Sequence, residues 1–443
     1  MRVLVVGGGG REHALVHSFA QSTLADRIFC APGNAGTAEI ADNIGVGTED
    51  LPALLDFASR EQVDLTVVGP EAPLVAGICD LFEEHGLAVF GPNRDAAQLE
   101  GSKVFAKEVM REGGVATGAY SRHETLESAL AALSPDGPYP LVVKADGLAA
   151  GKGVIICNDH AEARAAVESC FVARDFGAAG DVVVIEEFLA GSEVSLLVLC
   201  DGVNAVPLAP AQDYKRIFAG DQGPNTGGMG SYCPVPGFEQ TALDAAMEHV
   251  AEPVIAALRK RDIAFRGVLY AGLIVTDAGV KVLEFNCRFG DPETQAVLPR
   301  LDSDLLELCA AGASGELAGV KAAWKPLECV TVVMASAGYP ASSHKGDVIG
   351  GLAAADAMDG VTVYHAGTAR KNGDVVTAGG RVLAVSALGS GFAAARERAY
   401  AAVRKITFDG AQVRPDIAER AVKAAAGELD LFPAGSAGWA RGA

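Results

Sequence analysis

The stretch VKVLEFNCRFGDPE, residues 280–293, joins an apolar run to a dense group of polar side chains. Residues 280–285 favour a strand, and side chains two apart on a strand point to the same face. Glu284 and Asn286 are therefore expected to share a face, and a carboxylate beside an amide oxygen suits Mg²⁺, which completes its shell with water and nucleotide phosphates. Arg288 adds a planar fork for phosphate or carboxylate. Taken alone, the stretch is interpreted equally well as a strand end with a solvated charge cluster.

The length and composition predict a multidomain α/β enzyme. The chain has 443 residues, 53 of them glycine, and only 6% are aromatic; about two to four domains are expected. It has no uninterrupted apolar run of about 18 residues, so no membrane partner is predicted. The net charge of −20 repels nucleic acid and anionic membranes, so neither is expected as a partner. An anionic substrate would need a locally positive pocket.

The cysteines and the first residues predict a cytoplasmic protein. The nine cysteines are scattered without a CxxC pair, which favours reduced thiols over disulfides or a zinc site. The opening run MRVLVVGGGG is typical of a strand and a glycine turn rather than of a signal peptide.

The N-terminal hundred residues predict βα units whose strands end in Gly- or Pro-rich loops. The run at residues 2–6, the glycines at 7–10 and a helix to Phe19 would aim backbone N–H groups at a phosphate, although tight packing alone also explains such a turn. His13 could contact a substrate, cap the helix or be solvated. Ligands of open parallel sheets lie beyond the carboxyl ends of the strands. We therefore expect a binding surface made by Gly9, Arg11, Glu12, Asn34 and Glu71.

A loop of small residues at 145–153 lies between two predicted strands. A Walker P-loop is followed by a helix, whereas a strand is predicted to follow this loop. The residue spacing of the loop also differs from the Walker pattern GxxxxGK(S/T). The loop is instead interpreted as a mobile flap that closes over phosphates with backbone amides and Lys152, whose neighbours are Gly151 and Gly153. A plain flexible hairpin is the alternative.

Two further polar segments complete the central region. A strand at 182–185 runs into Glu186, Glu187, Phe188 and Leu189, a bend that could seat an adenine, with Glu193 placed for ribose hydroxyls; a charged linker is the alternative. The cluster QDYKR at 212–216 contains Asp213 and Lys215 and precedes the glycine-rich run 223–230. We interpret that run as a substrate loop rather than a disordered spacer. From about Trp324 a small α+β unit without a catalytic cluster is expected to be a wall or lid.

The set of Lys103, Lys144, the flap, the acidic bend and the Glu284–Asn286 pair resembles the ATP-grasp ligases. Seven segments extend the match, and in this order and spacing they resemble the glycinamide ribonucleotide synthetase family over about residues 1–425. They read GGGGREHAL, APGNAGT, GPEAPL, KADGLAAGKGV, QDYKR, NTGGMGSYCP and RFGDPETQ. Two features depart from the family pattern: the family usually has His where Tyr214 stands, and the last residues extend past its usual end.

The resemblance implies an α/β and α+β multidomain fold. It comprises a Rossmann-like N-terminal domain at 1–101, a two-lobed ATP-grasp core at 102–323 with a mobile flap lobe at about 118–188, a small α+β C-terminal domain at 324–426, and a flexible tail at 427–443. It also implies an enzyme that ligates glycine to 5-phosphoribosylamine through glycyl phosphate, with ATP and Mg²⁺ or Mn²⁺ as cofactors. A monomer is expected.

Residue roles follow from the same resemblance. The metal would be held by Glu284 and Asn286. ATP would be bound by Lys103, Lys144, Gly151, Lys152, Gly153, Glu186, Glu187, Phe188, Leu189 and Glu193. The catalytic residues would be Arg288, Asp213 and Lys215, with Asp213 on the glycine ammonium. Phosphoribosylamine would meet Gly9, Arg11, Glu12, Asn34, Glu71 and Asp291, its phosphate at the N-terminus of the first helix.

Two alternatives stay open. One is another ATP-grasp carboxylate–amine ligase or a carboxylase, although nothing in the sequence singles out a bicarbonate site. The other is a catalytically silent nucleotide-binding scaffold, which would have no need to keep every charged residue of the set.

Overall fold

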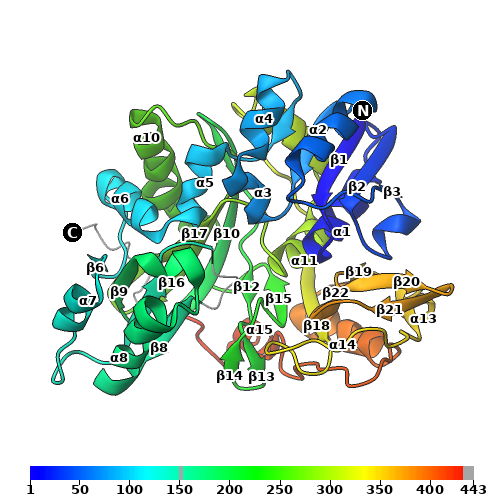
Figure 1. The fold of residues 1–443 in the computed structure, drawn as a ribbon. Coiled ribbons are helices and arrows are strands. Elements are labelled where there is room, and N and C mark those ends of the chain that lie inside the picture. Colours follow the sequence, from blue (N-terminus) through cyan, green and yellow to red (C-terminus); the bar gives the residue numbers. More distant parts are fainter. Residues whose placement is uncertain (149–152, 433–443) are drawn as a thin grey trace.

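The N-terminal unit is a parallel sheet covered by helices. The computed structural model describes residues 1–148 and 153–432, and this unit lies at the upper right of Figure 1. Its sheet has the order β3-β2-β1-β4-β5, and the central strands are buried on both faces, as parallel strands between helices must be. The strands are β1 (Arg2–Gly7), β2 (Arg27–Pro32), β3 (Asp42–Asn43), β4 (Leu65–Val68) and β5 (Val89–Phe90). The helices are α1 (Gly10–Phe19), α2 (Leu51–Arg60), α3 (Glu71–Ala76), α4 (Ile78–Glu84) and α5 (Arg94–Gly101).

Two segments with continuous helical periodicity are each broken by one residue. A single helix was expected over residues 74–85, but Gly77 has a φ of 93° and separates α3 from α4. A single helix was also expected from about residue 99 to 112. Ser102 is extended there and accepts from the Phe105 N–H, so it ends α5 and caps α6 (Lys103–Gly113).

The central region contains two antiparallel sheets. The smaller one has the order β6-β9-β7-β8 and carries its own apolar cluster, which includes Val143, Ala163 and Val183. This part of the chain, with its separate core, lies at the lower left of Figure 1. Its elements are β6 (Tyr120–His123), α7 (Leu126–Ala132), β7 (Leu141–Ala145), β8 (Val154–Cys157), α8 (His160–Glu168) and β9 (Val183–Glu187). The larger sheet has the order β11-β10-β16-β17, made by β10 (Ser192–Asp201), β11 (Ala205–Pro207), β16 (Arg266–Thr276) and β17 (Gly279–Asn286).

A β-bulge sets the direction of the polar side chains on β17. Glu284 pairs with Gly272, but the next partner, Leu273, faces Val282, so Leu283 is the extra residue. Without this insertion Glu284 would follow Val282 into the apolar core. With it, Phe285 packs in the core while Glu284 and Asn286 lie on the opposite face. The strand and the shared face of these two residues were predicted from the sequence, but the bulge was not.

The C-terminal sheet takes two strands from the central part of the chain. Its order is β12-β15-β18-β22-β19. Here β12 (Gln212–Asp213) and β15 (Gly230–Cys233) extend a sheet that otherwise begins with β18 (Glu328–Ala335), so this sheet crosses the predicted boundary at residue 324. The other two strands are β19 (Val361–His365) and β22 (Arg381–Gly389). The β-hairpins are β13 (Arg216–Phe218) with β14 (Gln222–Asn225), and β20 (Thr368–Lys371) with β21 (Asp374–Thr377).

The remaining helices pack around these sheets. α9 (Gln240–Ala246) and α10 (Glu252–Lys260) are joined through a π-helical turn at Met247–Ala251, which makes residues 240–260 one continuous helical segment. The others are α11 (Glu293–Val297), α12 (Leu305–Ser314), α13 (Leu352–Asp356), α14 (Phe392–Val403) and α15 (Glu419–Ala425). Within the predicted flexible tail, the Phe432 ring lies 6.3 Å from the Phe238 ring, while residues 433–443 lie outside the described ranges.

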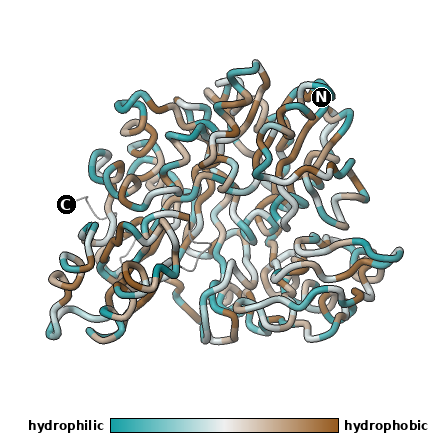
Figure 2. Tube along the Cα trace, in the orientation of Figure 1, coloured by the Kyte–Doolittle hydropathy of each residue, from teal (hydrophilic) through white to brown (hydrophobic). Residues whose placement is uncertain are grey.

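Apolar residues concentrate in the strands and on the inner helix faces, and hydrophilic residues in the outer turns (Figure 2). All nine cysteines are buried with free thiols. None of the described helices combines the length and the apolar character needed to cross a membrane.

Candidate active site

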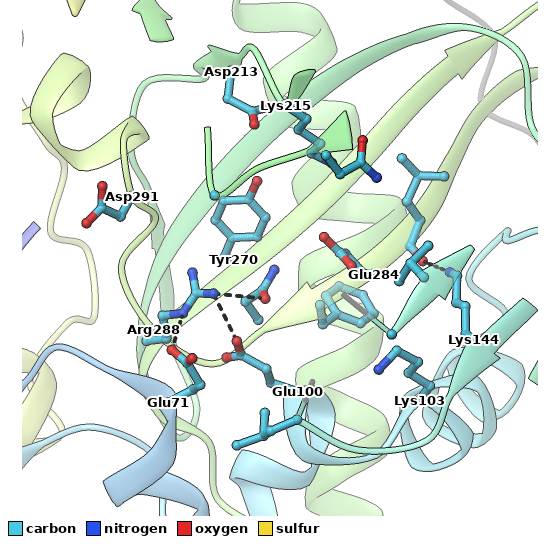
Figure 3. Close-up of a pocket in the computed structure, with 18 of the residues that line it drawn as sticks. Glu71, Glu100, Lys103, Lys144, Asp213, Lys215, Tyr270, Glu284, Arg288 and Asp291 are labelled. Atoms are coloured by element: carbon cyan, nitrogen blue, oxygen red, sulfur yellow. Dashed lines mark hydrogen bonds and ion pairs between the residues drawn. The ribbon is translucent and has the colours of Figure 1, made fainter. Parts of the chain in front are cut away.

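One cavity of about 590 Å³ is lined by residues from the N-terminal, central and C-terminal parts of the chain. Its charged lining comprises seven Lys or Arg and seven Asp or Glu side chains. The cavity is therefore formally neutral within a chain of net charge −20, rather than positive as expected. Figure 3 shows Lys103 and Lys144 at one end, the group of Arg288, Glu71 and Glu100 at the other, and Glu284 between them. The predicted site residues that line it are Arg11, Glu71, Lys103, Lys144, Gly153, Glu186, Asp213, Lys215, Glu284, Asn286, Arg288 and Asp291.

At the lysine end, one carboxylate lies between two ammonium groups. Glu186 Oε2 is 2.9 Å from Lys144 Nζ and 3.1 Å from Lys107 Nζ, and all three side chains are buried. Glu186 Oε1 is also buried, and it has no hydrogen-bond partner among the described residues. Burial lowers the pKa of Lys107, which Glu186 partly offsets. Lys107 carries no sequence signal of a site, because a lysine on an amphipathic helix is normally solvated.

The start of the predicted flap is tied to helix α6. Lys103 Nζ donates to the Gly147 carbonyl at 3.0 Å, and Asp146 accepts from the Val104 N–H at 3.1 Å. Burial lowers the pKa of Lys103, while Glu284 raises it. Gly153 lies at the cavity, whereas the predicted contacts of Gly151 and Lys152 fall outside the described residues.

Glu284 is surrounded by cationic side chains. Burial alone would raise the pKa of Glu284, but Lys215, Lys144 and Lys103 outweigh it and lower the pKa, so the group is a carboxylate. Within residues 1–148 and 153–432, no group of three or more His, Cys, Asp or Glu side chains could hold a metal. One carboxylate and the Asn286 amide oxygen still fit Mg²⁺, because that ion commonly takes only one or two protein ligands beside phosphates and water.

Arg288 is held by two carboxylates from the N-terminal unit. Its Nε lies 3.2 Å from Glu71, and a terminal nitrogen lies 3.0 Å from Glu100. A terminal nitrogen also donates to Asn286 Oδ1 at 3.3 Å, which links the arginine to the predicted metal ligand. Glu100 further accepts from the Cys287 N–H at 2.8 Å. Glu100 carries no sequence signal of a site, because its position near a helix end is typical of a solvated residue.

Asp213 and Lys215 form the third side of the cavity. Lys215 Nζ lies 2.5 Å from Glu193. Burial raises the pKa of Asp213 to about 7, with Lys215 opposing and Glu293 reinforcing the shift. Glu293 accepts from the Tyr270 hydroxyl at 2.9 Å and from Ser195 at 3.1 Å. Tyr270 and Glu293 also line the cavity and were not assigned roles from the sequence.

Three of the predicted substrate-binding residues do not line the cavity and instead have structural partners: Gly9, Glu12 and Asn34. Glu12 is buried and accepts from the Gly9 N–H at 2.5 Å. Asn34 is buried and donates to the carbonyls of Gly8 and His365. The Arg11 N–H donates to Asp291 at 3.3 Å. Carboxylates of the protein thus occupy the helix N-terminus where a phosphate was expected. The sequence shows polar residues at the strand ends but not which of them cap neighbouring backbone groups.

Of residues 186–189, which were predicted to seat an adenine, Glu186 lies within β9 and lines the cavity. Glu187 is half exposed and accepts from the Ala119 N–H at 3.1 Å. Phe188 and Leu189 are outside the lining, and Glu193 reaches the cavity through its ion pair with Lys215. The glycine-rich run 223–230, interpreted as a substrate loop, does contribute Asn225, Thr226 and Gly227.

Comparison with known proteins agrees with this geometry. The chain matches three domain models of one family: phosphoribosylglycinamide synthetase N domain over residues 1–100, ATP-grasp (A) domain over 101–294, and C domain over 329–420. The chain belongs to the phosphoribosylglycinamide synthetase family. It is an ATP-grasp ligase, and ATP-grasp ligases use ATP and a divalent metal ion.

Relatives within the phosphoribosylglycinamide synthetase family match nearly end to end. A phosphoribosylamine–glycine ligase of Pseudomonas aeruginosa is 49% identical over 431 residues, covering 97% of this chain and 100% of the relative. The crystal structure of a phosphoribosylamine–glycine ligase from Thermotoga maritima superposes with a TM-score of 0.82 at 34% identity, covering 94% of this chain and 100% of that one.

The fold is shared more widely. The biotin carboxylase domain of the Hydrogenobacter thermophilus 2-oxoglutarate carboxylase has a TM-score of 0.70 at 18% identity, covering 93% of this chain and 91% of that one. This likeness concerns the fold alone.

Proposed function

We propose that this family member ligates glycine to 5-phosphoribosylamine, giving glycinamide ribonucleotide, ADP and phosphate in purine biosynthesis. The supporting observation is the position of Glu284 within one cavity. It lies between the end that carries Lys103 and Lys144, which suits a nucleotide, and the end that carries Arg288, which suits an acyl phosphate and its acceptor (Figure 3).

The lysine-rich end suits ATP. Glu186 Oε1 is a buried acceptor that lacks a donor among the described residues, and the exocyclic amino group of adenine supplies one. Lys107 and Lys144 neutralise the charge of Glu186, and Lys103 reaches toward the phosphates. We assign the remaining adenine and ribose contacts to the segment 187–189 and to Glu193.

Glu284 and Asn286 would hold the metal ion, either Mg²⁺ or Mn²⁺. When bound, the ion neutralises charge on the transferring phosphoryl group. Three lysines face Glu284 and oppose a free cation, so the metal is expected to enter together with the nucleotide phosphates.

The end of the cavity that carries Arg288 would bring the two substrates together. In the first step a glycine carboxylate oxygen takes the γ-phosphoryl group and ADP leaves. In the second step the amine nitrogen of phosphoribosylamine attacks the acyl carbon, and the bond between that carbon and the phosphate oxygen breaks. Phosphate leaves, and the nitrogen loses a proton. Arg288 stabilises the acyl phosphate, and its rigid support by Glu71 and Glu100 fixes its direction. Asp213, beside Lys215, binds the glycine ammonium. Arg11, Glu71 and Asp291 face the phosphoribosylamine, and a closed site protects the acyl phosphate from water.

The family matches support the domain limits proposed from the sequence, which are 1–101, 102–323 and 324–426. One exception is that β12 and β15, from the central domain, pair into the sheet of the C-terminal domain. A monomeric cytoplasmic enzyme without nucleic-acid or membrane partners remains our proposal, in keeping with the charge of −20.

The test is release of ADP by the purified full chain. We expect release to need Mg²⁺, glycine and phosphoribosylamine together, and mass spectrometry to find the ligated product. An equal rate without glycine contradicts the proposal, and bicarbonate replacing glycine would favour a carboxylase. Folded protein that releases no ADP would favour a silent scaffold.

A further inference from the structure

The segment that carries Asp213 and Lys215 is fixed through its backbone carbonyl groups. The Tyr214 carbonyl accepts from Met229 N–H at 2.8 Å, and the Lys215 carbonyl from Thr226 N–H at 2.7 Å. The two outer carbonyls of residues 213–216 are held by arginines from the far end of the chain. Arg420 donates to the Asp213 carbonyl at 3.0 Å, and Arg414 donates to the Arg216 carbonyl at 2.9 Å.

The same two arginines contact the side chain between Asp213 and Lys215. The Arg420 guanidinium carbon lies 4.1 Å from the centroid of the Tyr214 ring, and that of Arg414 lies 4.8 Å from it. Both distances are within the range of cation–π attraction. Tyr214 is 3% exposed, so these contacts with its ring are shielded from solvent.

The segment from Arg414 to Arg420 is itself anchored to helix α14. Arg396 donates to the carbonyls of Pro415 at 2.6 Å and Ile417 at 2.9 Å, and the Tyr400 hydroxyl donates to the Arg414 carbonyl at 2.6 Å. In Figure 1, α15 lies beside the β13–β14 hairpin. A continuous set of hydrogen bonds thus runs from the C-terminal domain to the cavity wall.

We infer that Arg420 is a positioning residue for the glycine subsite, acting by fixing the Asp213 carbonyl and the Tyr214 ring so that the side chains of Asp213 and Lys215 point into the cavity. Asp213 ends β12, and Tyr214 and Lys215 lie between β12 and β13. Asp213 and Lys215 both line the cavity, whereas the Tyr214 ring between them packs against Arg420, so fixing that ring fixes the direction of its two neighbours. The C-terminal domain is then part of the catalytic apparatus rather than a wall. The inference rests on the proposed function, specifically on the glycine role of Asp213.

The test compares the full-length variants Arg420→Ala and Arg420→Lys with the wild type. Arg404→Ala is the matched control, because Arg404 is exposed and belongs to the same domain. Steady-state kinetics give kcat and KM for each substrate, and thermal denaturation reports folding. We expect Arg420→Ala to lower kcat/KM for glycine at least tenfold, with KM for ATP within twofold. A lysine keeps the positive charge, but it cannot both stack on the Tyr214 ring and donate to the Asp213 carbonyl as the planar guanidinium does. Arg420→Lys is therefore expected to lower kcat/KM for glycine by less than Arg420→Ala does.

Chemical rescue separates positioning from general support of the fold. Added guanidinium ion is expected to restore Arg420→Ala at least threefold, because the Arg420 side chain is 30% exposed and its site is accessible. Added ammonium is expected to have no such effect. A folded Arg420→Ala or Arg420→Lys with kcat/KM for glycine within twofold of the wild type overturns the inference. Equal loss for glycine and ATP, or no rescue by guanidinium, also overturns it. Should Arg420→Ala not fold, Arg420→Lys decides alone.

The two proposals fail differently. A wild-type enzyme that does not use glycine contradicts the proposed function and, with it, this inference. If instead the wild type uses glycine and Asp213→Asn raises KM for glycine while the Arg420 variants do not, only the positioning role is overturned.

Discussion

The Glu100 carboxylate lies 3.0 Å from the Arg288 guanidinium, and both side chains are largely shielded from solvent. Glu100 belongs to helix α5 of the N-terminal unit, whereas Arg288 directly follows β17. Burial raises the pKa of Glu100, and Arg288 opposes that shift. This pair therefore joins two units at the arginine that faces the proposed acyl phosphate.

Replacing Glu100 with Gln is expected to lower kcat at least tenfold, since Arg288 gains freedom at the reacting centre. The free energy of unfolding should fall by about 1–3 kcal/mol, because a buried charge loses one of its two partners. Kinetics and urea denaturation measure the two effects. The control is Glu83→Gln, which breaks an exposed ion pair to Arg266 between the same units and should cost about 0–1 kcal/mol. Equal kcat in both variants would remove Glu100 from the positioning of Arg288.

Replacing Glu284 with Gln is expected to abolish the gain in nucleotide affinity that Mg²⁺ gives. Wild-type enzyme should bind ADP more tightly with Mg²⁺ than without it. The variant loses the carboxylate while Lys103, Lys144 and Lys215 remain, so metal-free ADP should bind at least as tightly as in the wild type and Mg²⁺ should give little gain. Calorimetric titration with and without Mg²⁺ measures this. An unchanged gain from Mg²⁺ would exclude Glu284 as a metal ligand. Turnover of Glu284→Ala and Asn286→Ala should also be lost while the fold persists.

Asp213 is expected to give opposite pH dependences of activity and stability. Its pKa is raised mainly by burial to about 7. Because the carboxylate binds the glycine ammonium, kcat/KM for glycine should rise with pH through about 7, and Asp213→Asn should flatten this rise. Because the pKa of Asp213 is raised in the folded state, the stability that its protonated form contributes is complete at pH values below the pKa of the unfolded chain. This contribution is lost as pH rises through about 7. The variant should therefore melt higher than the wild type at pH 8, with a smaller difference at pH 5.

Two buried histidines are expected to make the fold acid-sensitive. His13 Nδ1 accepts from the His365 N–H at 2.7 Å, where α1 meets β19. Burial lowers the pKa of His13 to about 3 and that of His365 to about 4. Such depressed values give stability that is complete above the unfolded pKa, about 6.5, and is lost as pH falls toward 4 and 3. The loss should be about 1.4 kcal/mol per pH unit for each imidazole.

The variant His13→Asn tests this dependence. Asn keeps an acceptor near the position of Nδ1 but does not titrate, so the slope of unfolding free energy between pH 6 and 4 should become shallower. His85→Asn is the control, since His85 is exposed on the outer end of α4. If the two variants give the same slope, His13 does not contribute to the acid sensitivity.

Local patterns predicted the elements of the site better than their relative positions. The two-residue period of a strand placed Glu284 and Asn286 on one face, and both line the cavity. Strict alternation along the strand, however, would place Glu284 and Asn286 on the same face as Val282, which packs in the core. The bulge at Leu283 is what turns them to the cavity. Such a bulge depends on pairing with β16, which is a long-range relationship without a local sequence signal.

Burial of charge was the main feature hidden from the sequence. Lys107 and Glu100 lie on amphipathic helices where solvation is the rule, and they are buried because partners arrive from distant segments. The reverse holds for Glu12 and Asn34, which were predicted to bind substrate but satisfy nearby backbone groups. His13 was left open between substrate contact, capping and solvation, and it is instead buried against the C-terminal domain.

The sheet shared by residues 212–233 and residues 328–389 has a consequence for recombination between relatives. A chimera that exchanges only the residues after 324 would pair the foreign β18 with the host β15, and the foreign Arg420 with the host Tyr214. Differences at these pairs would appear as incompatibility even though each parent is active. A workable crossover therefore transfers 212–233 together with the C-terminal domain, so that two separate pieces of the chain are inherited as one unit.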